Sequence, residues 1–373
     1  MRALHVITGL GVGGAEQQLR LLLRHLPVEC DVVTLTNPGP VAAGLRADGV
    51  RVAHLGMRGN RDLTAVSRLA RLIRRGSYDL VHTHLYRACV YGRLAARLAG
   101  VRARVATEHS LGRAEIEGRP LTAGTRALYL ASERLGSATV AVSPTVAGRL
   151  RDWGVPAGRV HLVPNGIDAH RFRFRAERRR ATRTRLGLPD GAFVAGGVGR
   201  LVPGKRFDLL VRAVAALPGV RLVLAGDGPE RAALTALAAR LGAGDRITLL
   251  GELADGGPGP DVPDLLGAVD VFVSPSREES FGLAVLEALA AGLPVLYRAC
   301  PAIEDLPAAF APHAVRVGDD AASLTAALRA SEGGPRRPPP PAVDRYDIRR
   351  SSRDLMDVYT HVLAGARPTE RAH

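Results

Sequence analysis

The chain has 373 residues, which is more than one typical hydrophobic core accommodates, so we expect two domains. Its three cysteines (Cys30, Cys89 and Cys300) lie far apart without metal-ligand spacing, which argues against a disulfide framework or a zinc site and favours a reducing cytoplasm. The net charge of +15 suggests nucleic-acid binding, but aromatic residues for base stacking are not interleaved with the basic ones. An anionic, phosphate-bearing small substrate explains the charge equally well.

Short apolar, β-branched runs alternate with helix-like stretches along the first half of the chain. Residues 1–8 are predicted to form the first strand, because their apolar part is too short for a signal peptide. No apolar run reaches membrane-spanning length. Further strands are predicted at 32–35, 50–55, 80–82, 105–107, 139–142 and 160–163, with helices at 16–25, 62–75 and 90–98.

The second half repeats this plan, with strands predicted at 193–198, 221–224, 247–250, 271–273 and 295–296. Two rounds of βαβ repetition predict two Rossmann-like domains, at 1–170 and 187–345. The strongly basic segment 171–186 is interpreted as a linker with an exposed helix, and 335–341 as a Pro-rich spacer. A terminal helix is expected at 346–363, with one apolar face formed by Leu355, Val358, Tyr359 and Val362.

A glycine-rich loop, Gly9-Leu-Gly-Val-Gly-Gly-Ala-Glu16, follows the first strand and precedes a helix. Glycines there allow a ligand to approach the backbone closely. The spacing also satisfies the dinucleotide-binding pattern G-x-G-x-x-G, but Thr34-Leu-Thr36 stands where an acidic residue would end the second strand. We prefer a loop that faces a substrate, with Gly13 and Gly14 nearest to it.

The single lysine of the chain, Lys205, lies in a second turn between a strand and a helix, Gly199-Arg200-Leu-Val-Pro-Gly-Lys205. Such turns bind anions in α/β proteins, and a compact ammonium group suits a phosphate oxygen approached end-on. The alternative interpretation is that an ordinary surface turn carries this lysine.

The strongest pattern is Glu279-Ser-Phe-Gly-Leu-Ala-Val-Leu-Glu287. A helix that begins after Gly282 would leave Glu279 on the preceding loop and Glu287 about one turn into the helix. Carboxylates can then bind sugar and ribose hydroxyls while the exposed helix amides bind a diphosphate. The alternative is a helix capped by Ser280 with an acidic first turn, which is common in α/β proteins.

The chain resembles the family 4 retaining glycosyltransferases of GT-B fold, which have two Rossmann-like domains facing a central cleft. Six motifs in the order of that family carry the resemblance. They are Gly13-Gly14-Ala15-Glu16, Val105-Ala-Thr-Glu-His-Ser110, Val163-Pro-Asn-Gly-Ile-Asp168, Gly199-Arg200 with Lys205, Ala225-Gly-Asp-Gly-Pro-Glu230, and Glu279 to Glu287 followed by Ala290-Ala-Gly-Leu-Pro-Val295. In that family the C-terminal segment, here 346–363, crosses back onto the first domain.

The resemblance implies roles for individual residues. Arg200 and Lys205 match the cations that hold the donor diphosphate, Glu279 a carboxylate near the transferred sugar, and His109 a histidine that contacts that sugar near the reaction centre. Glu287 matches the carboxylate that binds the ribose. The remaining donor-binding positions are Gly13, Gly14, Asn165, Gly199, Gly226, Leu250, Gly251, Phe281, Gly282 and Leu283. No Asp-x-Asp metal motif is present, which implies a transferase that needs no metal or other cofactor. The segment Arg298–Glu304 departs from the family, which more often has a Gly-Gly pair there.

The acceptor is predicted from charge. Glu108, Glu115 and Glu117 gather in sequence beside His109 within a basic first half, which suits a cationic small molecule such as an aminocyclitol. Arg113 and Arg119 could instead neutralise these glutamates on a surface helix. A narrower resemblance, to actinobacterial transferases that build aminoglycosides from 2-deoxystreptamine and a UDP-sugar, implies UDP-N-acetylglucosamine or UDP-glucose as donor.

Other interpretations stay open. A GT-B sugar-nucleotide epimerase or hydrolase, a transferase acting on a lipid or polysaccharide, and a nucleic-acid-binding protein are the alternatives. His82 and His84 are assigned a structural or acceptor-side role, on the argument that they alternate along a strand instead of sharing a face with a third metal ligand. Helix 62–75 places Leu63, Val66, Leu69 and Ile73 on one face, and its basic side chains are interpreted as a solvated face in preference to a membrane-docking one.

Overall fold

A computed structural model describes residues 1–117, 119–253 and 259–366 of the chain. The chain divides into two compact units. Unit 1 contains residues 1–166 together with the C-terminal segment from 348 onward, and unit 2 contains residues 167–347.

Unit 1 is built on a seven-stranded parallel sheet with the order β3-β2-β1-β4-β5-β8-β9. The chain winds outward from β1 in both directions, so the strand order reverses between β1 and β4. The strands are β1 (Arg2–Gly9), β2 (Glu29–Asn37), β3 (Arg51–His54), β4 (Leu80–His84), β5 (Ala103–Glu108), β8 (Ala138–Ala141) and β9 (Val160–Leu162), and β6 (Glu115–Ile116) pairs with β7 (Arg119–Pro120) as a separate hairpin.

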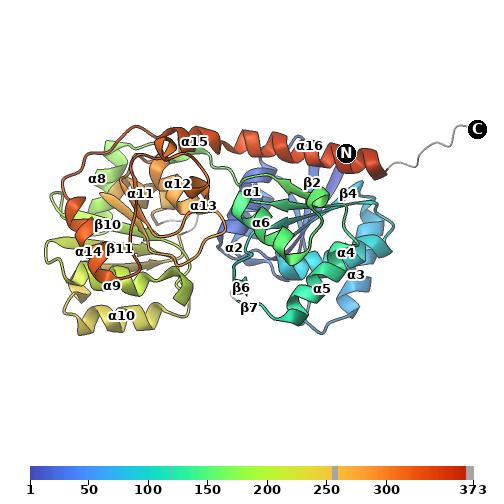
Figure 1. Cartoon of the computed structure of the whole chain (residues 1–373), viewed down its shortest axis with the longest axis horizontal. Coiled ribbons are helices and arrows are strands. Elements are labelled where there is room, and N and C mark those ends of the chain that lie inside the picture. The colour runs from blue at the N-terminus through green and yellow to red at the C-terminus, as the bar shows by residue number, and fades with distance from the viewer. Residues whose placement is uncertain (118, 254–258, 367–373) are drawn as a thin grey trace, which may run out of the picture. The chain divides into compact units, whose positions relative to one another are not determined.

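Helices cover both faces of this sheet (Figure 1). On one face, α1 (Gly14–Leu23), α2 (Gly39–Ala47) and α16 (Ile348–Ala366) share an apolar core with the strands, and on the other face α3 (Thr64–Gly76) and α4 (Tyr86–Leu98) do so. The other helices of unit 1 are α5 (Ala123–Glu133), α6 (Pro144–Trp153) and η1 (Ala157–Arg159).

Unit 2 repeats the architecture with a six-stranded parallel sheet, ordered β12-β11-β10-β13-β14-β15. Its strands are β10 (Phe193–Val198), β11 (Val220–Ala225), β12 (Ile247–Gly251), β13 (Val271–Ser274), β14 (Val295–Tyr297) and β15 (Ala314–Arg316). Its helices are α7 (Ala169–Phe172), α8 (Ala176–Arg185), η2 (Pro203–Lys205), α9 (Phe207–Ala215), α10 (Arg231–Arg240), η3 (Gly244–Arg246), α11 (Val262–Ala268), α12 (Leu283–Ala290), α13 (Pro301–Glu304), η4 (Ala308–Phe310), α14 (Ala321–Ala330) and α15 (Pro341–Arg345).

The α/β class with two Rossmann-like sheets is confirmed, and every strand predicted from the sequence is present. The strand β15 was not predicted, because three residues of which two are exposed carry no apolar pattern. The side of α3 that packs on the sheet consists of Ala65, Leu69, Ala70 and Ile73. The predicted apolar face was wrong at Leu63, which precedes the helix and is 76% exposed.

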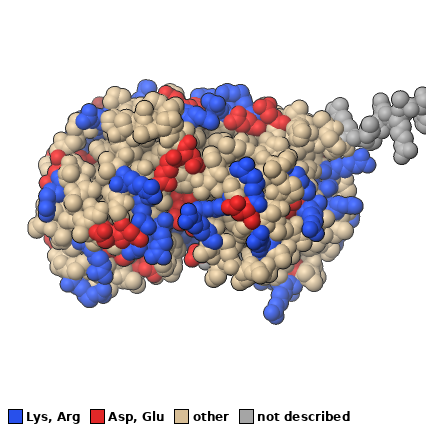
Figure 2. Space-filling view, viewed as in Figure 1, with Lys and Arg blue, Asp and Glu red and all other residues tan. Residues whose placement is uncertain are grey.

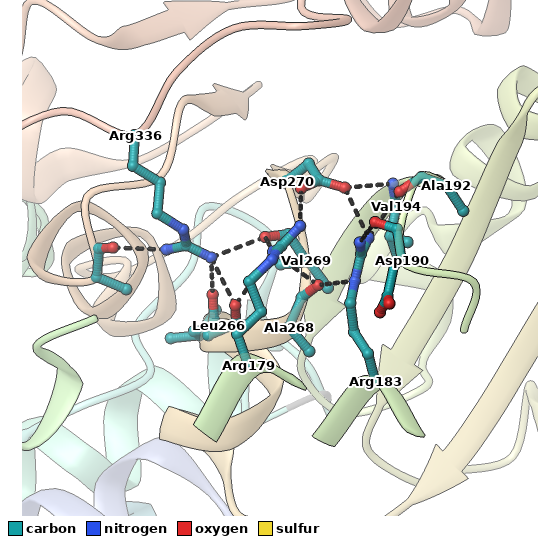
Figure 3. A network of polar contacts seen from close by, with 12 residues as sticks. Arg179, Arg183, Asp190, Ala192, Val194, Leu266, Ala268, Val269, Asp270 and Arg336 are labelled. Atoms are coloured by element: carbon teal, nitrogen blue, oxygen red, sulfur yellow. Dashed lines mark hydrogen bonds and ion pairs between the residues drawn. The ribbon is translucent and has the colours of Figure 1, made fainter. Parts of the chain in front are cut away.

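The basic segment 171–186 is not a free linker, because α8 packs on α11 within unit 2. Arg183 of α8 is only 2% exposed, whereas most of the helix is exposed as expected. Two arginines of α8 and Arg336 converge on the C-terminal end of α11 and on Asp270, the residue before β13 (Figure 3). Arg336 lies in the predicted Pro-rich spacer, which is thereby attached to the body of unit 2.

The guanidinium groups satisfy carbonyls that the end of a helix leaves without partners. Arg336 donates to the carbonyls of Leu266, Gly267 and Val269 at 2.8 Å each. Arg179 and Arg183 each bind one carboxylate oxygen of Asp270, at 2.5 and 3.0 Å, and Asp270 also accepts a 2.8 Å hydrogen bond from the Val194 amide of β10. One carboxylate therefore links α8 to two central strands of the sheet.

Asp270→Asn should lower the free energy of unfolding of the protein by about 3 kcal/mol, because the buried Arg183 then lacks a carboxylate. Chemical denaturation measures the change. The matched control is Glu332→Gln, which removes an exposed carboxylate of unit 2 and should change stability by less than about 0.5 kcal/mol. Equal stabilities of the two variants would contradict the structural role of Asp270.

Candidate functional site

In unit 2 four predicted donor-binding residues lie at the carboxyl ends of β10, β11 and β12, namely Gly199, Gly226, Leu250 and Gly251. Gly226 follows β11 and donates a 2.7 Å hydrogen bond from its amide to the carbonyl of Gly251. Gly226 has a φ of +131°, and a Cβ there would lie 1.9 Å from the carbonyl oxygen of Gly199. Only glycine therefore allows these loops to pack so closely, and Gly199, Gly226 and Leu250 are half-buried there at the strand ends.

The two predicted cations of unit 2 differ in their partners: Lys205 forms an ion pair, and Arg200 forms none with the residues described. The ammonium of Lys205 lies 2.5 Å from a carboxylate oxygen of Glu279, so the two candidate catalytic residues form an ion pair. The pairing follows from topology, because η2 comes after β10 and Glu279 comes after its neighbour β13, and the Arg277 amide binds the Gly204 carbonyl across the gap. Arg200 is exposed and makes no ion pair or side-chain hydrogen bond with any residue described. Arg200 is thus a cation available to an anion.

The helix α12 begins after Gly282, as predicted, and its N-cap is Gly282 itself with a φ of +104°, not Ser280. The first-turn amides of a helix have no partner within it, so the loop from Phe281 to Leu283 presents donors. Glu287 lies one turn into α12 and is half-buried, and Glu279 stays on the loop. The carboxylates and the helix start therefore lie on one loop-helix segment of unit 2.

The segment Arg298–Glu304, which departs from the family pattern, packs against this loop and holds it by hydrogen bonds. The Phe281 carbonyl accepts hydrogen bonds from the Ala302 amide at 2.9 Å and from the Cys300 thiol at 3.4 Å. A Cβ on Gly282 would lie 2.3 Å from the sulfur of Cys300, so the two residues are in close contact. Burial raises the pKa of Cys300, which keeps it a thiol. Nothing in the sequence pattern pointed to Cys300 as a support for this loop.

In unit 1 the glycine-rich loop leads into α1 with Gly13 as N-cap. A Cβ on Gly13 would lie 2.4 Å from a carboxylate oxygen of Glu16, so this acidic side chain already lies against the start of the helix. Behind the loop, a cavity of about 20 Å³ is lined by side chains from α1, β5, β8 and α16 together with His109 and Asn165. Asn165 and His109 thus line the same cavity, and Gly13 caps the helix α1 that contributes to its wall.

A row of buried histidines lies on the sheet face that α16 covers. His5 on β1 is the register partner of His82 on β4, and His84 is two residues further along the same strand. Side chains two apart on a strand point to the same face, so the argument that His82 and His84 do not share a face with a third ligand was wrong. The ring nitrogens of His5, His82 and His84 lie within 4.8 Å of one another, which makes the three a possible metal-ligand set.

The nitrogens of His82 are engaged elsewhere, however. Its Nδ1 lies 2.6 Å from the Tyr359 hydroxyl of α16 and its Nε2 lies 2.7 Å from the Thr107 hydroxyl. Burial lowers the pKa of His5 to about 3 and that of His109 to about 4. Burial, followed by the neighbouring imidazoles, lowers the pKa of His82 and His84 well below its usual value. The whole row is therefore neutral at physiological pH.

The three glutamates predicted to bind the acceptor are not gathered into one pocket. Glu108 is the last residue of β5, its carboxylate is fully buried, and it points to the sheet face opposite to that of its neighbour Thr107. Thr107 contacts His82, and His109, which follows the strand, contacts His84 on that same face. Glu117 binds the Tyr86 amide at the start of α4, and Glu115 is exposed on β6. Glu108, which was predicted to bind the acceptor beside His109, therefore faces the other side of the sheet.

The face drawn in Figure 2 carries no uninterrupted stripe of basic side chains among the residues that the structure describes. On the face drawn in Figure 2, acidic side chains are interleaved with the basic ones. Several arginines are engaged with backbone carbonyls, as around α11. Within the part of the chain that the structure describes, no helix is both long and apolar enough to cross a membrane.

The two parallel-sheet units match the fold of solved GT-B glycosyltransferases. The structure of Anabaena HepE in complex with UDP and glucose superimposes with a TM-score of 0.84, covering 97% of this chain and 100% of that one at 22% sequence identity. Sucrose-phosphate synthase from Thermosynechococcus elongatus superimposes with a TM-score of 0.70 at 21% identity, covering 98% and 97% of the two chains. These likenesses show the fold.

Residues 12–171 match the family described as Glycosyltransferase Family 4, and residues 178–330 match Glycosyl transferases group 1. A GDP-mannose-dependent alpha-mannosyltransferase of Mycobacterium tuberculosis is 35% identical over 271 residues, which cover 70% of this chain and 68% of the relative. The D-inositol 3-phosphate glycosyltransferase of Salinispora tropica is 33% identical over 328 residues, which cover 78% of this chain and 65% of the relative. The chain belongs to the family 4 glycosyltransferases.

The burial of Glu108 predicts a specific pH dependence of stability. Desolvation, together with the nearby Glu117, raises the pKa of Glu108 to about 7. The folded protein then holds this proton at a pH where the unfolded chain releases it. Glu108 contributes stability below the pKa of an ordinary glutamate, about 4.5, and loses it as the pH rises through about 7.

Glu108→Gln imitates the protonated carboxyl at every pH. Relative to the wild type, this variant should gain roughly 3 kcal/mol in free energy of unfolding between pH 5 and pH 8. Urea unfolding of both proteins across that range measures the difference. Glu115→Gln, which changes an exposed glutamate, should show no such trend. A difference between wild type and Glu108→Gln that is independent of pH would contradict the raised pKa.

Proposed function

We propose that the protein is a retaining glycosyltransferase that moves a sugar from a nucleotide diphosphate donor to a cyclitol acceptor. The observation that carries the proposal is the arrangement in unit 2, where Arg200, the Lys205–Glu279 pair and the start of α12 follow strands of one parallel sheet. Side-chain cations and helix amides there can hold the charge of a leaving diphosphate without a metal motif. Membership of a family of glycosyltransferases supports the reaction class.

On the donor side, Arg200 and Lys205 would bind the diphosphate oxygens, with the amides from Phe281 to Leu283 on the same group. Glu287 would bind the ribose hydroxyls and Glu279 those of the transferred sugar. The backbone at Gly199, Gly226, Leu250 and Gly251 would contact the nucleotide. Because Lys205 is paired with Glu279 in the free protein, a bound diphosphate would compete with that carboxylate for the ammonium group.

The reaction exchanges one bond for another at the anomeric carbon. The bond from that carbon to the diphosphate oxygen breaks, and a bond to the acceptor hydroxyl oxygen forms on the same face. The acceptor proton passes to the departing diphosphate, so a nucleoside diphosphate and an α-glycoside result. Arg200 and Lys205 stabilise the negative charge that develops on the leaving group, and fixed positioning supplies much of the remaining acceleration.

For the acceptor we propose a cyclitol phosphate as the first choice. The relative from Salinispora tropica is named for D-inositol 3-phosphate, and residues 1–170 carry 23 basic against 12 acidic residues, which favours an anionic acceptor. An aminocyclitol such as 2-deoxystreptamine is the second choice. Its ammonium groups would need the carboxylates of Glu108, Glu115 and Glu117 together, and that of Glu108 is buried. A UDP-sugar is our first choice of donor. GDP-mannose is the main alternative, because one of the relatives is named as GDP-mannose-dependent.

Lys205→Ala should lower kcat of sugar transfer at least about 100-fold, since it removes charge stabilisation that is strongest in the transition state. The matched control is Arg212→Ala, which removes one exposed cation from the neighbouring helix α9 and should leave kcat unchanged. Steady-state kinetics with the best donor and acceptor provide the measurement. Near-normal turnover of Lys205→Ala would remove Lys205 from the catalytic residues.

A matrix of donors and acceptors, read by mass spectrometry, tests the reaction itself. UDP-N-acetylglucosamine, UDP-glucose and GDP-mannose are each combined with inositol 3-phosphate, inositol, 2-deoxystreptamine and a lipid acceptor. We expect a product with inositol 3-phosphate heavier by one sugar residue. A product with 2-deoxystreptamine alone would contradict the anionic acceptor, and a product with the lipid alone would contradict the cyclitol.

Conversion of the donor to an isomer or to free sugar, with no acceptor product, would replace the transferase by an epimerase or a hydrolase. The configuration of the new bond, read from the coupling constant of the anomeric proton, should be α. A β-product would contradict retention of configuration.

A further inference from the structure

Three imidazoles in unit 1, the buried rings of His5 and His84 and the half-buried ring of His109, are joined end to end. His5 Nδ1 lies 3.0 Å from His84 Nε2, and His84 Nδ1 lies 3.1 Å from His109 Nε2. The strands that carry them explain the row, because β1 and β4 are neighbours and His109 follows directly after β5, the next strand. His109 lies at the end of the row that lines the cavity with Gln18 and Asn165.

A chain of neutral imidazoles has a direction. Each neutral ring carries one N–H donor and one bare acceptor nitrogen, so each contact needs one of each. If His5 donates to His84, then His84 must donate to His109, and the remaining nitrogen of His109 carries the N–H. If His109 donates instead, every ring is reversed and the outer nitrogen of His5 carries the N–H. The tautomer of His109 is therefore tied to those of the two rings behind it.

The two outer nitrogens decide between these arrangements. His5 Nε2 is buried and has no partner among the residues described, and its ring is 0% exposed. His109 Nδ1 is likewise buried without a described partner, but His109 borders a cavity whose volume of about 20 Å³ accepts a water molecule or a ligand oxygen. An orphaned N–H is rarer in protein interiors than an orphaned acceptor, so the bare nitrogen belongs on the closed side, at His5.

We propose that His5 and His84 are positioning residues that hold His109 as its Nδ1–H tautomer, so that His109 donates a hydrogen bond to an oxygen of a ligand in unit 1. The group bound there is a hydroxyl or carbonyl oxygen, as on a sugar or a cyclitol, and not a cation. The consequence for catalysis rests on the proposed glycosyltransferase function. The tautomer itself does not.

His82 is the natural control for this arrangement. Its ring is the nearest to His84, with 4.2 Å between centroids, yet its nitrogens are satisfied by the hydroxyls of Tyr359 and Thr107. Tyr359→Phe removes one of those hydrogen bonds on the same sheet face without touching the row from His5 to His109. Its effect therefore reports the cost of disturbing the buried histidines in general.

The first experiment determines the tautomers in the wild-type protein. Long-range proton–nitrogen correlation spectra of the full-length protein, labelled with ¹⁵N in its histidines, show which nitrogen of each neutral ring is protonated. His109 is identified by the signal lost in His109→Gln. We expect Nδ1–H for His109 at neutral pH, and an Nε2–H signal there would overturn the proposal.

Two replacements of His84 then test the dependence on that ring. His84→Gln keeps a donor and an acceptor in a side chain of similar length, and His84→Met keeps no donor and only a weakly accepting sulfur. We expect His109 to remain Nδ1–H in His84→Gln and to become a mixture of tautomers in His84→Met, with Tyr359→Phe unchanged. An unchanged His109 signal in a folded His84→Met protein would show that the row does not set the tautomer.

Kinetics separate this proposal from the proposed function. His84→Met should lower kcat of donor hydrolysis or transfer roughly tenfold with little change in the KM for the donor, and His84→Gln should restore most of the loss. If the protein has no transferase activity, the spectra still decide the tautomer. Metal analysis of the purified protein decides the competing arrangement, because a stoichiometric transition metal on His5, His82 and His84 would overturn the hydrogen-bonded row.

Discussion

Parallel pairing at the centre of each sheet is the constraint on which the candidate sites depend. In unit 1 the chain starts at β1 and adds strands on one side before crossing to β4 on the other, and unit 2 does the same around β10 and β13. Parallel strands bring all their carboxyl ends to one edge, and at the reversal point no crossover covers that edge. The loops after β10 and β13 therefore leave the sheet side by side, which places Lys205 against Glu279 although 74 positions separate them.

The pleat of the same strands sorts polar side chains between the two faces. His5, His82 and His84 lie on the face covered by α16, where Tyr359 and Thr107 provide hydroxyl partners. Glu108 lies on the other face, with the buried Arg93 of α4 and Tyr129 of α5 among the groups that act on its carboxyl. Thr107 and Glu108 are adjacent in sequence, yet they belong to two polar networks on opposite faces of the sheet. The sheet separates the two networks, so their side chains do not contact one another.

Several arginines of this chain stabilise the fold by binding backbone carbonyls, a role that the net charge of the chain does not reveal. Guanidinium groups of Arg179, Arg183 and Arg336 satisfy the carbonyls that end α11, and Arg246 binds the carbonyls of Val214, Leu217 and Val220 in the same way. Each of these side chains replaces a cap that the helix or turn does not supply itself. Part of the +15 charge is therefore committed to the fold, and the single lysine stands apart as a cation paired with a loop carboxylate.

The sequence alone determined the α/β class, the positions of nearly all the strands and the start of α12, because these depend on local periodicity and on glycines with particular backbone angles. Its motifs also predicted Arg200, Lys205, Glu279 and Glu287 as candidate donor-binding residues. Only the tertiary structure decided which face each side chain occupies and what meets it there. It separated Glu108 from His109, joined His5 to a strand 79 residues away, and packed α8 on α11. Such contacts depend on strand order and register, which no local stretch of sequence encodes.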